Sequence, residues 1–359
     1  MISNSPDTGE VTLHKTFGLI ALLGSGETSL AGGRIFETVA QQLPCPLRIA
    51  VLETPAGFEL NSPQVAGRLA DFLSTRLQNY QPVIDLVPAR KRGSPFSPDD
   101  LSILKPLLSA NLVIMGPGSP TYAVRQLKGT LAWNLIRARY RQGAGLVFTS
   151  AATIAVGMRV VPVYEIYKVG QEITCPPGLG LFADFGLSLS CVPHWNNTDG
   201  GAEVDTSRCF IGMDRFKEWL AMLPPAHTVL GLDEHTGLII DFSSGVCAVS
   251  GVSSVSLLRN RDPEIHPAGT SFPVDRLGPI HCPDAIEAGI PARIWKLLQQ
   301  AEAETDSGSI PQEIRDLVEQ RKIARAAGDW AESDALRQRI YNLGWQVRDT
   351  PAGQVVSSR

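Results

Sequence analysis

The stretch that decides the fold is GLVFTSAATIAVG, residues 145–157. Its apolar residues run into Thr149-Ser150, and small residues that suit a helix follow at once. This order predicts a buried strand that turns directly into a helix, and such a turn exposes a side chain at the edge of the sheet. Ser150 is therefore either a nucleophile held on a tight turn or a small residue that fills the junction between two elements.

Other apolar runs surround this strand in the sequence. Each stops at a turn, mostly rich in glycine or proline, and helix-length segments separate several of them. Apolar strands that alternate with helices predict an α/β fold with a flavodoxin-like, mostly parallel sheet and helices on both faces. Ligands bind such sheets at the carboxyl ends of the strands. The expected strands lie within residues 17–28, 47–59, 81–89, 110–122 and 143–152, and the expected helices within 61–79, 98–109 and 121–142.

The sequence changes character after residue 157. Residues 185–197, FGLSLSCVPHWNN, predict a strand that ends at His194. Residues 227–259 predict three short strands joined by glycine-containing turns. A loop-rich segment and a helix over 291–304 follow.

A polar segment, TDSGS at residues 305–309, predicts a linker between a large domain over 1–304 and a small module over 310–359. The module reads as two helices and a short hairpin, and Asp329 with Glu332 forms a capping box at the start of its second helix. Eight basic and seven acidic residues give the module a net charge of +1.

Composition narrows the function classes. The chain has 359 residues, of which 43% are apolar and 19% charged, and its net charge of −4 does not suggest a general nucleic-acid or membrane-surface binder. No apolar run approaches the roughly 20 residues that span a bilayer, and the first residues lack the pattern of a secretion signal. Six scattered cysteines form no CxxC pair. We expect a cytoplasmic protein with reduced thiols, no metal, no cofactor and no membrane partner.

A serine nucleophile needs a base, a group that orients the base, and donors for the oxyanion. The turn after the strand aims the Ala151 N–H at the oxyanion position, and Gly118 in the loop GPGSP offers a second donor. His194 is the candidate base, and Glu234 in VLGLDEHTGLII is the candidate orienting carboxylate. Each also has a plain structural reading, as a histidine bonded to the backbone at a strand end and as a surface carboxylate.

The order of Ser150, His194 and Glu234 resembles the cyanophycinase/dipeptidase E family of serine peptidases. The motifs that carry the resemblance are Thr149-Ser150-Ala151-Ala152, residues 231–237 (GLDEHTG) and, more loosely, Gly116-Pro117-Gly118. It covers residues 17–260 and implies a class I glutamine amidotransferase-like fold with a Ser-His-Glu triad. The implied function is serine-type hydrolysis of a peptide or amide bond in a small substrate.

The chain departs from the family pattern at two places around the serine and at a third around His194. Phe148 and Ala152 stand where the family usually has glycine, and VPHWNN around His194 differs from the family's DQHF-type stretch. A non-catalytic scaffold that keeps the amidotransferase-like fold is therefore the competing hypothesis.

Three further residues are candidate substrate contacts. Arg208 would bind a substrate carboxylate, since the resemblance implies aspartyl substrates, while Glu27 and Glu53 follow strands and would line the site. A surface arginine and two solvated loop acids are the plain alternatives.

The tail resembles the C-terminal segment of bacterial cysteinyl-tRNA synthetases over about residues 310–356. The matching residues include Arg321, Arg325, Arg337, Gly344 and Asp349. The resemblance implies tRNA binding, in which Arg321 and Arg325 share a helix face and Arg337 joins them across the hairpin. No synthetase active-site signature is present, so an active aminoacyl-tRNA synthetase is not expected. The alternative is a module for docking or for a homodimer.

Overall fold

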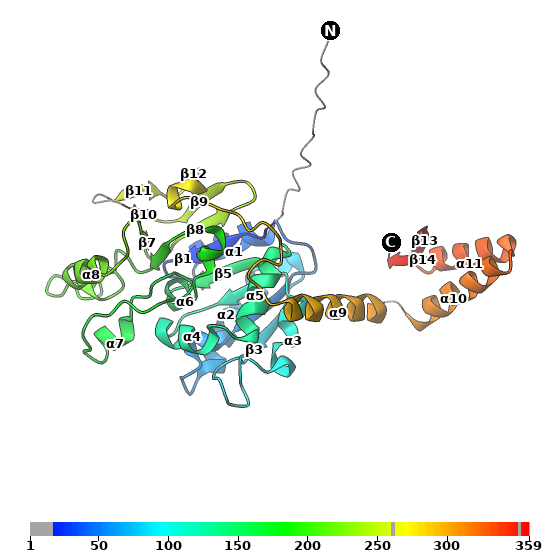
Figure 1. Cartoon of the computed structure of the whole chain (residues 1–359), viewed down its shortest axis with the longest axis horizontal. Coiled ribbons are helices and arrows are strands. Elements are labelled where there is room, and N and C mark those ends of the chain that lie inside the picture. Colours follow the sequence, from blue (N-terminus) through cyan, green and yellow to red (C-terminus); the bar gives the residue numbers. More distant parts are fainter. Residues whose placement is uncertain (1–16, 260–262, 310, 351–352, 359) are drawn as a thin grey trace, which may run out of the picture. The chain divides into compact units, whose positions relative to one another are not determined.

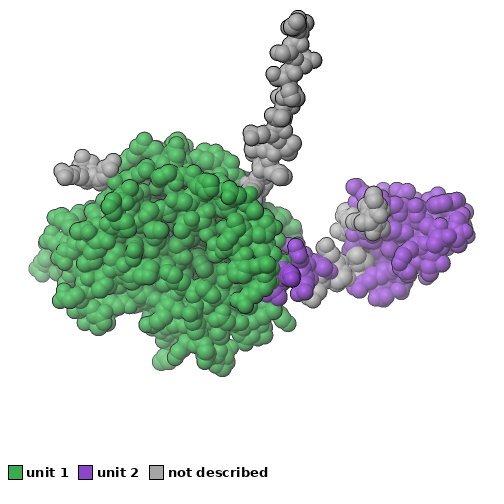
Figure 2. Space-filling model, in the orientation of Figure 1, with its two compact units in different colours: residues 1–295 green, residues 296–359 purple. Residues whose placement is uncertain are grey.

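The computed structural model describes residues 17–259, 263–309, 311–350 and 353–358 of the chain. It divides into two compact units, residues 1–295 and 296–359 (Figure 1, Figure 2). None of its described helices is long and apolar enough to cross a membrane.

Residues 305–309 differ from the sequence prediction. They form the last turns of helix α9 (Ala292–Ser309) rather than a linker. Extending a helix costs far less free energy than starting one, so a helix begun by the apolar residues after Ala292 continues through the polar TDSGS. The expected domain bounds, 1–304 and 310–359, stay a prediction.

The first unit is built on an eight-stranded sheet. Strands β3, β2, β4, β5 and β1 lie side by side in that order and run parallel, and β8, β9 and β12 add antiparallel pairs beyond β1. This mostly parallel sheet confirms the predicted α/β class. The strands are β1 (Ile20–Leu23), β2 (Arg48–Leu52), β3 (Val83–Val87), β4 (Leu112–Met115), β5 (Gly145–Thr149), β8 (Thr236–Asp241), β9 (Val246–Gly251) and β12 (Ser271–Pro273).

Helices cover both faces of this sheet (Figure 1). On one face, α1 and α2 pack in an apolar cluster that includes Val147 of β5. Neighbouring strand residues point to opposite faces, and Leu146 and Phe148 are as fully buried as Val147, so the second face is covered as well. The helices of this part of the chain are α1 (Leu30–Ala40), α2 (Ser62–Arg76), α3 (Leu101–Ser109), α4 (Pro120–Leu127), α5 (Leu131–Arg141) and α6 (Ala151–Ala155). Two further helices, α7 (Val163–Tyr167) and α8 (Gly212–Ala221), share an apolar core with strands of the second sheet.

The expected helix over 121–142 is two helices, α4 and α5. Gly129 between them has a φ of +77°, which a helix cannot contain. Thr130 then caps α5, because its side chain accepts the N–H of Trp133.

A second sheet has the order β11-β10-β7-β6, in which β6 and β7 run parallel. Residues 227–259 form four strands rather than the expected three, because the chain crosses twice between the two sheets: β7 and β10 belong here, β8 and β9 to the main sheet. The strands are β6 (Leu189–Val192), β7 (Thr228–Leu232), β10 (Ser254–Leu258) and β11 (Glu264–Pro267).

The second unit has its own core. Helices α10 (Gln312–Ala326) and α11 (Trp330–Asn342) pack together with the hairpin of β13 (Trp345–Thr350) and β14 (Gly353–Ser358), as the sequence predicts. The Asp329 side chain caps α11 by accepting the Glu332 N–H at 3.0 Å. Ile323 on α10 is 62% exposed. The buried core residues are Ile314, Leu317, Ala324, Leu336, Ile340 and Val347.

His227 is a buried histidine just before β7. Its Nδ1 lies 2.7 Å from Ser188 Oγ and its Nε2 lies 2.9 Å from Ser190 Oγ, so both ring nitrogens have hydroxyl partners. Burial lowers the pKa of His227 to about 4, with a smaller contribution from the positive charge of Arg159. The ring is therefore neutral in the folded protein at neutral pH.

Lowering the pH should destabilise the fold through His227. Between pH 6.5, the ordinary pKa of histidine, and about pH 4, His227 binds a proton in the unfolded state but not in the folded state. The stability that the neutral ring contributes is therefore complete above pH 6.5 and is lost as the pH falls through this range. The free energy of unfolding should fall in this window by at most ~1.4 kcal/mol per pH unit from this group. Urea unfolding of the native chain and His227→Gln at pH 7 and pH 5 measures it. If the free energies of unfolding of the native chain and His227→Gln do not come closer together at pH 5, the lowered pKa of His227 is contradicted.

Candidate active site

Ser150 lies on a strained turn between β5 and α6. Its φ of +49° is rare for a residue with a side chain. The Ser150 N–H donates to the carbonyl of Leu23 at 3.2 Å, and Thr153 Oγ1 donates to the carbonyls of Leu23 and Phe148 at 2.9 and 2.8 Å. Phe148 and Ala152, the two departures from the family pattern, are fully buried, so the tight turn forms without glycine on either side.

His194 follows β6 and reaches Ser150 from the second sheet. Its Nε2 lies 3.0 Å from Ser150 Oγ, and its Nδ1 lies 2.8 Å from Glu234 Oε1. The His194 backbone also has a positive φ, +48°, and its N–H donates to the carbonyl of Gly24 at 3.2 Å. The structure thus brings the three candidate residues into one hydrogen-bonded array, here called the Ser-His-Glu array.

Two asparagines that the sequence analysis gave no role hold Glu234 in place. Asn197 Nδ2 donates to Glu234 Oε1 at 3.0 Å, and Asn196 Oδ1 accepts the Glu234 N–H at 2.8 Å. Burial raises the pKa of Glu234, but the hydrogen bonds from His194 and Asn197, with the charges of His194 and His235, outweigh it and lower that pKa. The two consecutive asparagines that follow His194-Trp195 are the feature of the sequence from which these contacts could have been predicted.

The end of β1 touches all three segments of the array. The Leu23 carbonyl accepts from Ser150, and the Gly24 carbonyl accepts from His194. The Gly24 N–H donates to Thr236 at 2.8 Å, and a Cβ on Gly24 would lie 2.1 Å from the carbonyl oxygen of Asp233. Only glycine lets these segments approach so closely.

A small pocket opens beside Ser150, here called the serine pocket. Its volume is about 100 Å³. In the described part of the chain, the N–H groups of Gly118 and Ala151 donate no hydrogen bond, so both are available for an oxyanion. Its lining is Pro117, Gly118, Pro120, Ser150, Ala151, Ile154, Val163, Tyr164, His194, Cys209 and Phe210.

Gly118 meets the neighbouring loop backbone to backbone. Its φ is +145°, and a Cβ there would lie 2.1 Å from the carbonyl oxygen of Pro55. The next N–H, that of Ser119, donates to the same Pro55 carbonyl at 2.9 Å. This contact fixes the loop that presents the Gly118 N–H.

Arg208 does not take the predicted place in the pocket. Its guanidinium lies 3.9 Å from the centroid of the Trp195 ring, and its Nη1 donates to the Trp195 carbonyl at 2.8 Å. Arg208, Cys209 and Phe210 all have positive φ, between 58° and 67°, and the Cys209 N–H donates to the His194 carbonyl at 3.1 Å. Arg208 therefore braces the histidine loop, and it is not among the residues that line the serine pocket.

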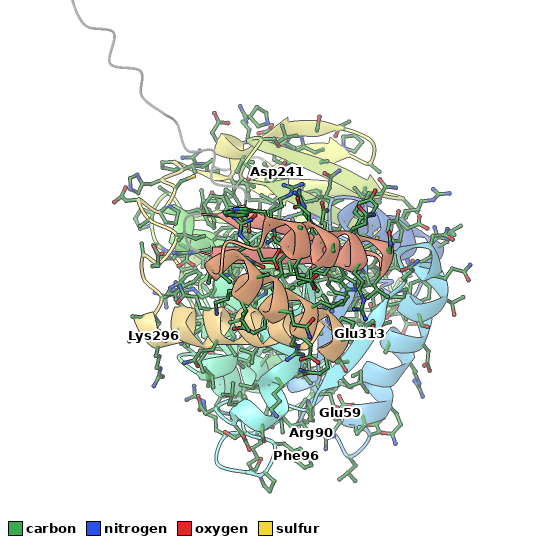
Figure 3. All side chains as sticks on the ribbon, turned by 90° about the vertical axis from the view of Figure 1, so that its right-hand side faces the viewer. Glu59, Arg90, Phe96, Asp241, Lys296 and Glu313 are labelled. Carbon is green, nitrogen blue, oxygen red and sulfur yellow. The ribbon has the colours of Figure 1, made fainter. Side chains whose placement is uncertain are left out.

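Glu53 is also engaged within the protein. It is 4% exposed, accepts from Arg90 Nε at 2.6 Å and accepts from Ser62 Oγ at 3.0 Å. The Arg90 guanidinium stacks 4.3 Å from the centroid of Phe96, and both side chains project from the loop after β3 (Figure 3). Glu53 thus anchors the loop that Gly118 touches. Glu27 is half-buried between β1 and α1 and does not line the serine pocket.

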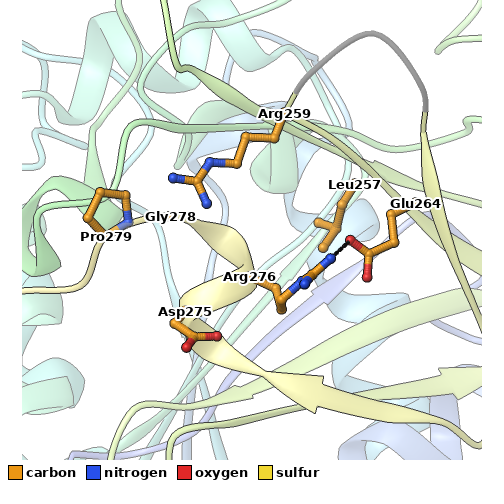
Figure 4. Close-up of a pocket in the computed structure, with 7 residues that line it drawn as sticks. All are labelled: Leu257, Arg259, Glu264, Asp275, Arg276, Gly278 and Pro279. Atoms are coloured by element: carbon orange, nitrogen blue, oxygen red, sulfur yellow. Dashed lines mark hydrogen bonds and ion pairs between the residues drawn. The ribbon is translucent and has the colours of Figure 1, made fainter.

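A larger hollow of about 510 Å³ lies beside strands β10 and β11 (Figure 4). An ion pair between Arg276 and Glu264 crosses it, and no residue of the Ser-His-Glu array reaches it. Its lining is Leu257, Arg259, Glu264, Asp275, Arg276, Gly278 and Pro279. Among all the described residues, no three histidine, cysteine or acidic side chains lie close enough together to hold a metal ion.

The three tail arginines differ in how far their charges are free to contact a phosphate. Arg321 is 1% exposed and forms a two-pronged ion pair with Asp349 at 2.9 and 3.0 Å, so it cannot present its charge to a phosphate as the sequence analysis expected. Arg325 shares Asp349 at 3.3 Å and lies over the Trp330 ring. Arg337 is exposed, and its charge helps the two other arginines lower the pKa of Asp349.

A search of solved structures finds a peptidase from an acI-B1 Actinobacterium. The match has a TM-score of 0.58 and 19% identity, and it covers 72% of this chain and 98% of that one. At this identity the likeness establishes a shared fold, which confirms the predicted class I glutamine amidotransferase-like architecture of the first unit.

The tail matches the family model for the cysteinyl-tRNA ligase anticodon binding domain over residues 307–356. Cysteine–tRNA ligase 1 of Burkholderia lata is 44% identical over 45 residues, which are 12% of this chain and 10% of that protein. The ligase of Caldicellulosiruptor saccharolyticus is 43% identical over 63 residues, 18% of this chain and 13% of that protein. The chain spans only about a tenth of the length of these ligases, and the predicted resemblance of the tail is confirmed.

Gly118→Ala should destabilise the protein far more than Gly129→Ala. Both glycines have positive φ, but a Cβ at Gly118 meets backbone atoms whereas one at Gly129 meets nothing within 4 Å. We expect a loss of ~3 kcal/mol or more at Gly118 and about 1 kcal/mol at Gly129, measured by denaturant unfolding. Equal losses would show that φ alone, and not the contact with Pro55, constrains this loop.

Proposed function

We propose that the first unit is a serine-type hydrolase of a peptide or amide bond. The observation that carries the proposal is the unbroken array in which Ser150 Oγ lies 3.0 Å from His194 Nε2 and His194 Nδ1 lies 2.8 Å from Glu234. Hydrogen-bond distances of this kind are what a nucleophile, a base and an orienting group require. The competing hypothesis, a non-catalytic scaffold, gives no reason for three side chains from separate loops to align in this way.

In the proposed reaction, Ser150 Oγ attacks the carbonyl carbon of the substrate and passes its proton to His194 Nε2. The N–H groups of Gly118 and Ala151 stabilise the oxyanion that forms. His194 then gives the proton to the leaving amine, which departs and leaves an acyl group on Ser150. A water molecule, deprotonated by His194, attacks this acyl group, and the proton returns to Ser150 as the acid is released.

The environment of Glu234 suits the orienting role. Its lowered pKa keeps the carboxylate ionised at neutral pH, where it can stabilise the protonated imidazole. The hydrogen bond from Asn197 fixes the oxygen that faces His194 Nδ1. The six cysteines are free, which suits the proposed cytoplasmic location.

Fluorophosphonate labelling tests the nucleophile. We expect the probe to label Ser150 in the folded protein, Ser150→Ala to abolish labelling, and Ser74→Ala, an exposed serine on α2, to leave it unchanged. Glu234→Gln should slow labelling by roughly 10²- to 10⁴-fold, because the imidazole loses the partner that orients it. Mass spectrometry of the labelled peptide identifies the site.

Two results would contradict this proposal. A folded native protein that the probe leaves unlabelled would favour the scaffold reading. A Glu234→Gln variant that is labelled at the native rate would remove Glu234 from the mechanism while leaving Ser150 and His194 in it.

A second function, tRNA binding by the tail, is favoured by the match to an anticodon binding domain over residues 307–356. Of the three predicted arginines, Arg337 is exposed and Arg325 is half-buried beside Asp349, so these two can still reach a phosphate. Arg321 would act only by holding Asp349 and the fold of the module.

A gel shift with tRNA at several salt concentrations tests the tail. The full chain should bind more weakly as salt rises, and a chain ending at Ser309 should not bind. Arg337→Gln should lower the slope of log affinity against log salt by about 0.7–0.9, as one lost phosphate contact requires. Arg215→Gln, an exposed charge on α8, is the control. Equal binding by both chain lengths, or none at low salt, would leave the tail a docking or dimerisation module.

A further inference from the structure

A second pocket adjoins the serine pocket and is here called the aromatic pocket. Its volume is about 230 Å³. Tyr164 lines both pockets, and Ser119 and Thr121 of the aromatic pocket flank Pro120 of the serine pocket. A ligand held at Ser150 can therefore extend into it. The lining is Phe58, Ser119, Thr121, Tyr122, Arg125, Tyr164, Glu165 and Val169.

Aromatic rings form the walls of this pocket. The Phe58 ring lies 5.2 Å from that of Tyr122 and 6.2 Å from that of Tyr164, in tilted and edge-on orientations. Phe58 is 46% exposed, although aromatic side chains favour burial. The Tyr122 hydroxyl already donates to the Arg90 carbonyl at 2.9 Å, so Tyr122 offers the pocket mainly its ring.

The lining of the pocket carries one cation and one anion. Arg125 lies 5.3 Å from the centroid of Tyr122, and Glu165 accepts a hydrogen bond from Thr121. One cation and one anion at the same pocket favour neither an acidic nor a basic ligand group, whereas the exposed Phe58 ring and the two tyrosine rings beside it favour an apolar, flat one.

We propose that the aromatic pocket binds an aromatic side chain of the substrate, on a residue close to the bond that Ser150 attacks. This inference rests on the proposed function, since it takes the ligand of the serine pocket to be a peptide. An additional ring at 4.5–7 Å from Phe58 and Tyr164 would complete a cluster of the kind that aromatic side chains form in protein cores.

Binding to Ser150→Ala tests this pocket without turnover. Calorimetry would compare short peptides that differ at one residue, which is phenylalanine, alanine, aspartate or arginine. We expect the phenylalanine peptide to bind about tenfold more tightly than the others. Adding Phe58→Ala should remove that preference, and adding Leu60→Ala, a fully exposed residue on the same loop, should not. Melting curves confirm that both variants are folded.

A charge switch provides the second measurement. Arg125→Gln leaves Glu165 as the one charged residue of the pocket lining, so the arginine peptide should gain affinity several-fold over the aspartate peptide. A variant that merely loosens the fold would not change the order of the two peptides.

The outcomes separate this inference from the proposed function. Equal affinity for all four peptides, tightest binding of a charged one, or no binding of any would overturn the aromatic pocket. Fluorophosphonate labelling of Ser150 then decides the hydrolase proposal independently. An unlabelled native protein whose Ser150→Ala variant prefers the phenylalanine peptide would keep the pocket and overturn the hydrolase.

Discussion

The site depends on Leu23, which ends the first strand, and on Gly24, which follows it. The Leu23 carbonyl receives the serine turn, and the Gly24 carbonyl receives the histidine loop. The absent side chain of Gly24 leaves room for the segment that carries Glu234. Three loops from two sheets thus take their positions from one short piece of backbone. Because β1 is hydrogen-bonded to a strand on each side, the sheet fixes the backbone that sets the spacing of the three side chains.

The loops around this anchor are held in unfavourable backbone conformations. Ser150, His194 and the run from Arg208 to Phe210 all have positive φ. Each such residue costs on the order of 1–3 kcal/mol unless its surroundings impose it. Here the surroundings are a stacked guanidinium, a buried indole and a set of backbone hydrogen bonds. The strain and the packing together leave the histidine ring few alternative positions.

The sequence predicted candidate site residues best where a reactive side chain directly follows a strand. Ser150, His194 and Glu234 could be predicted as one site because each follows an apolar run that forms a strand. The sequence did not show that these strands belong to two sheets. Helix α1 was missed because Gly32-Gly33 lowers helix propensity, although Gly32 is required where a Cβ would lie 2.4 Å from the Gly26 carbonyl oxygen. The true roles of Arg208 and Glu53 depend on partners far along the chain, which no local pattern encodes.

The ion pair of buried Arg321 with Asp349 changes what the match to the ligases means. The residues that carry the likeness include this pair, the helix cap Asp329 and the left-handed Gly344. All of them serve folding, so selection for a stable module alone would keep them. A module of this kind can therefore lose every contact with nucleic acid and still match the family, because the matching residues named here stabilise the fold, while binding depends on exposed residues between them.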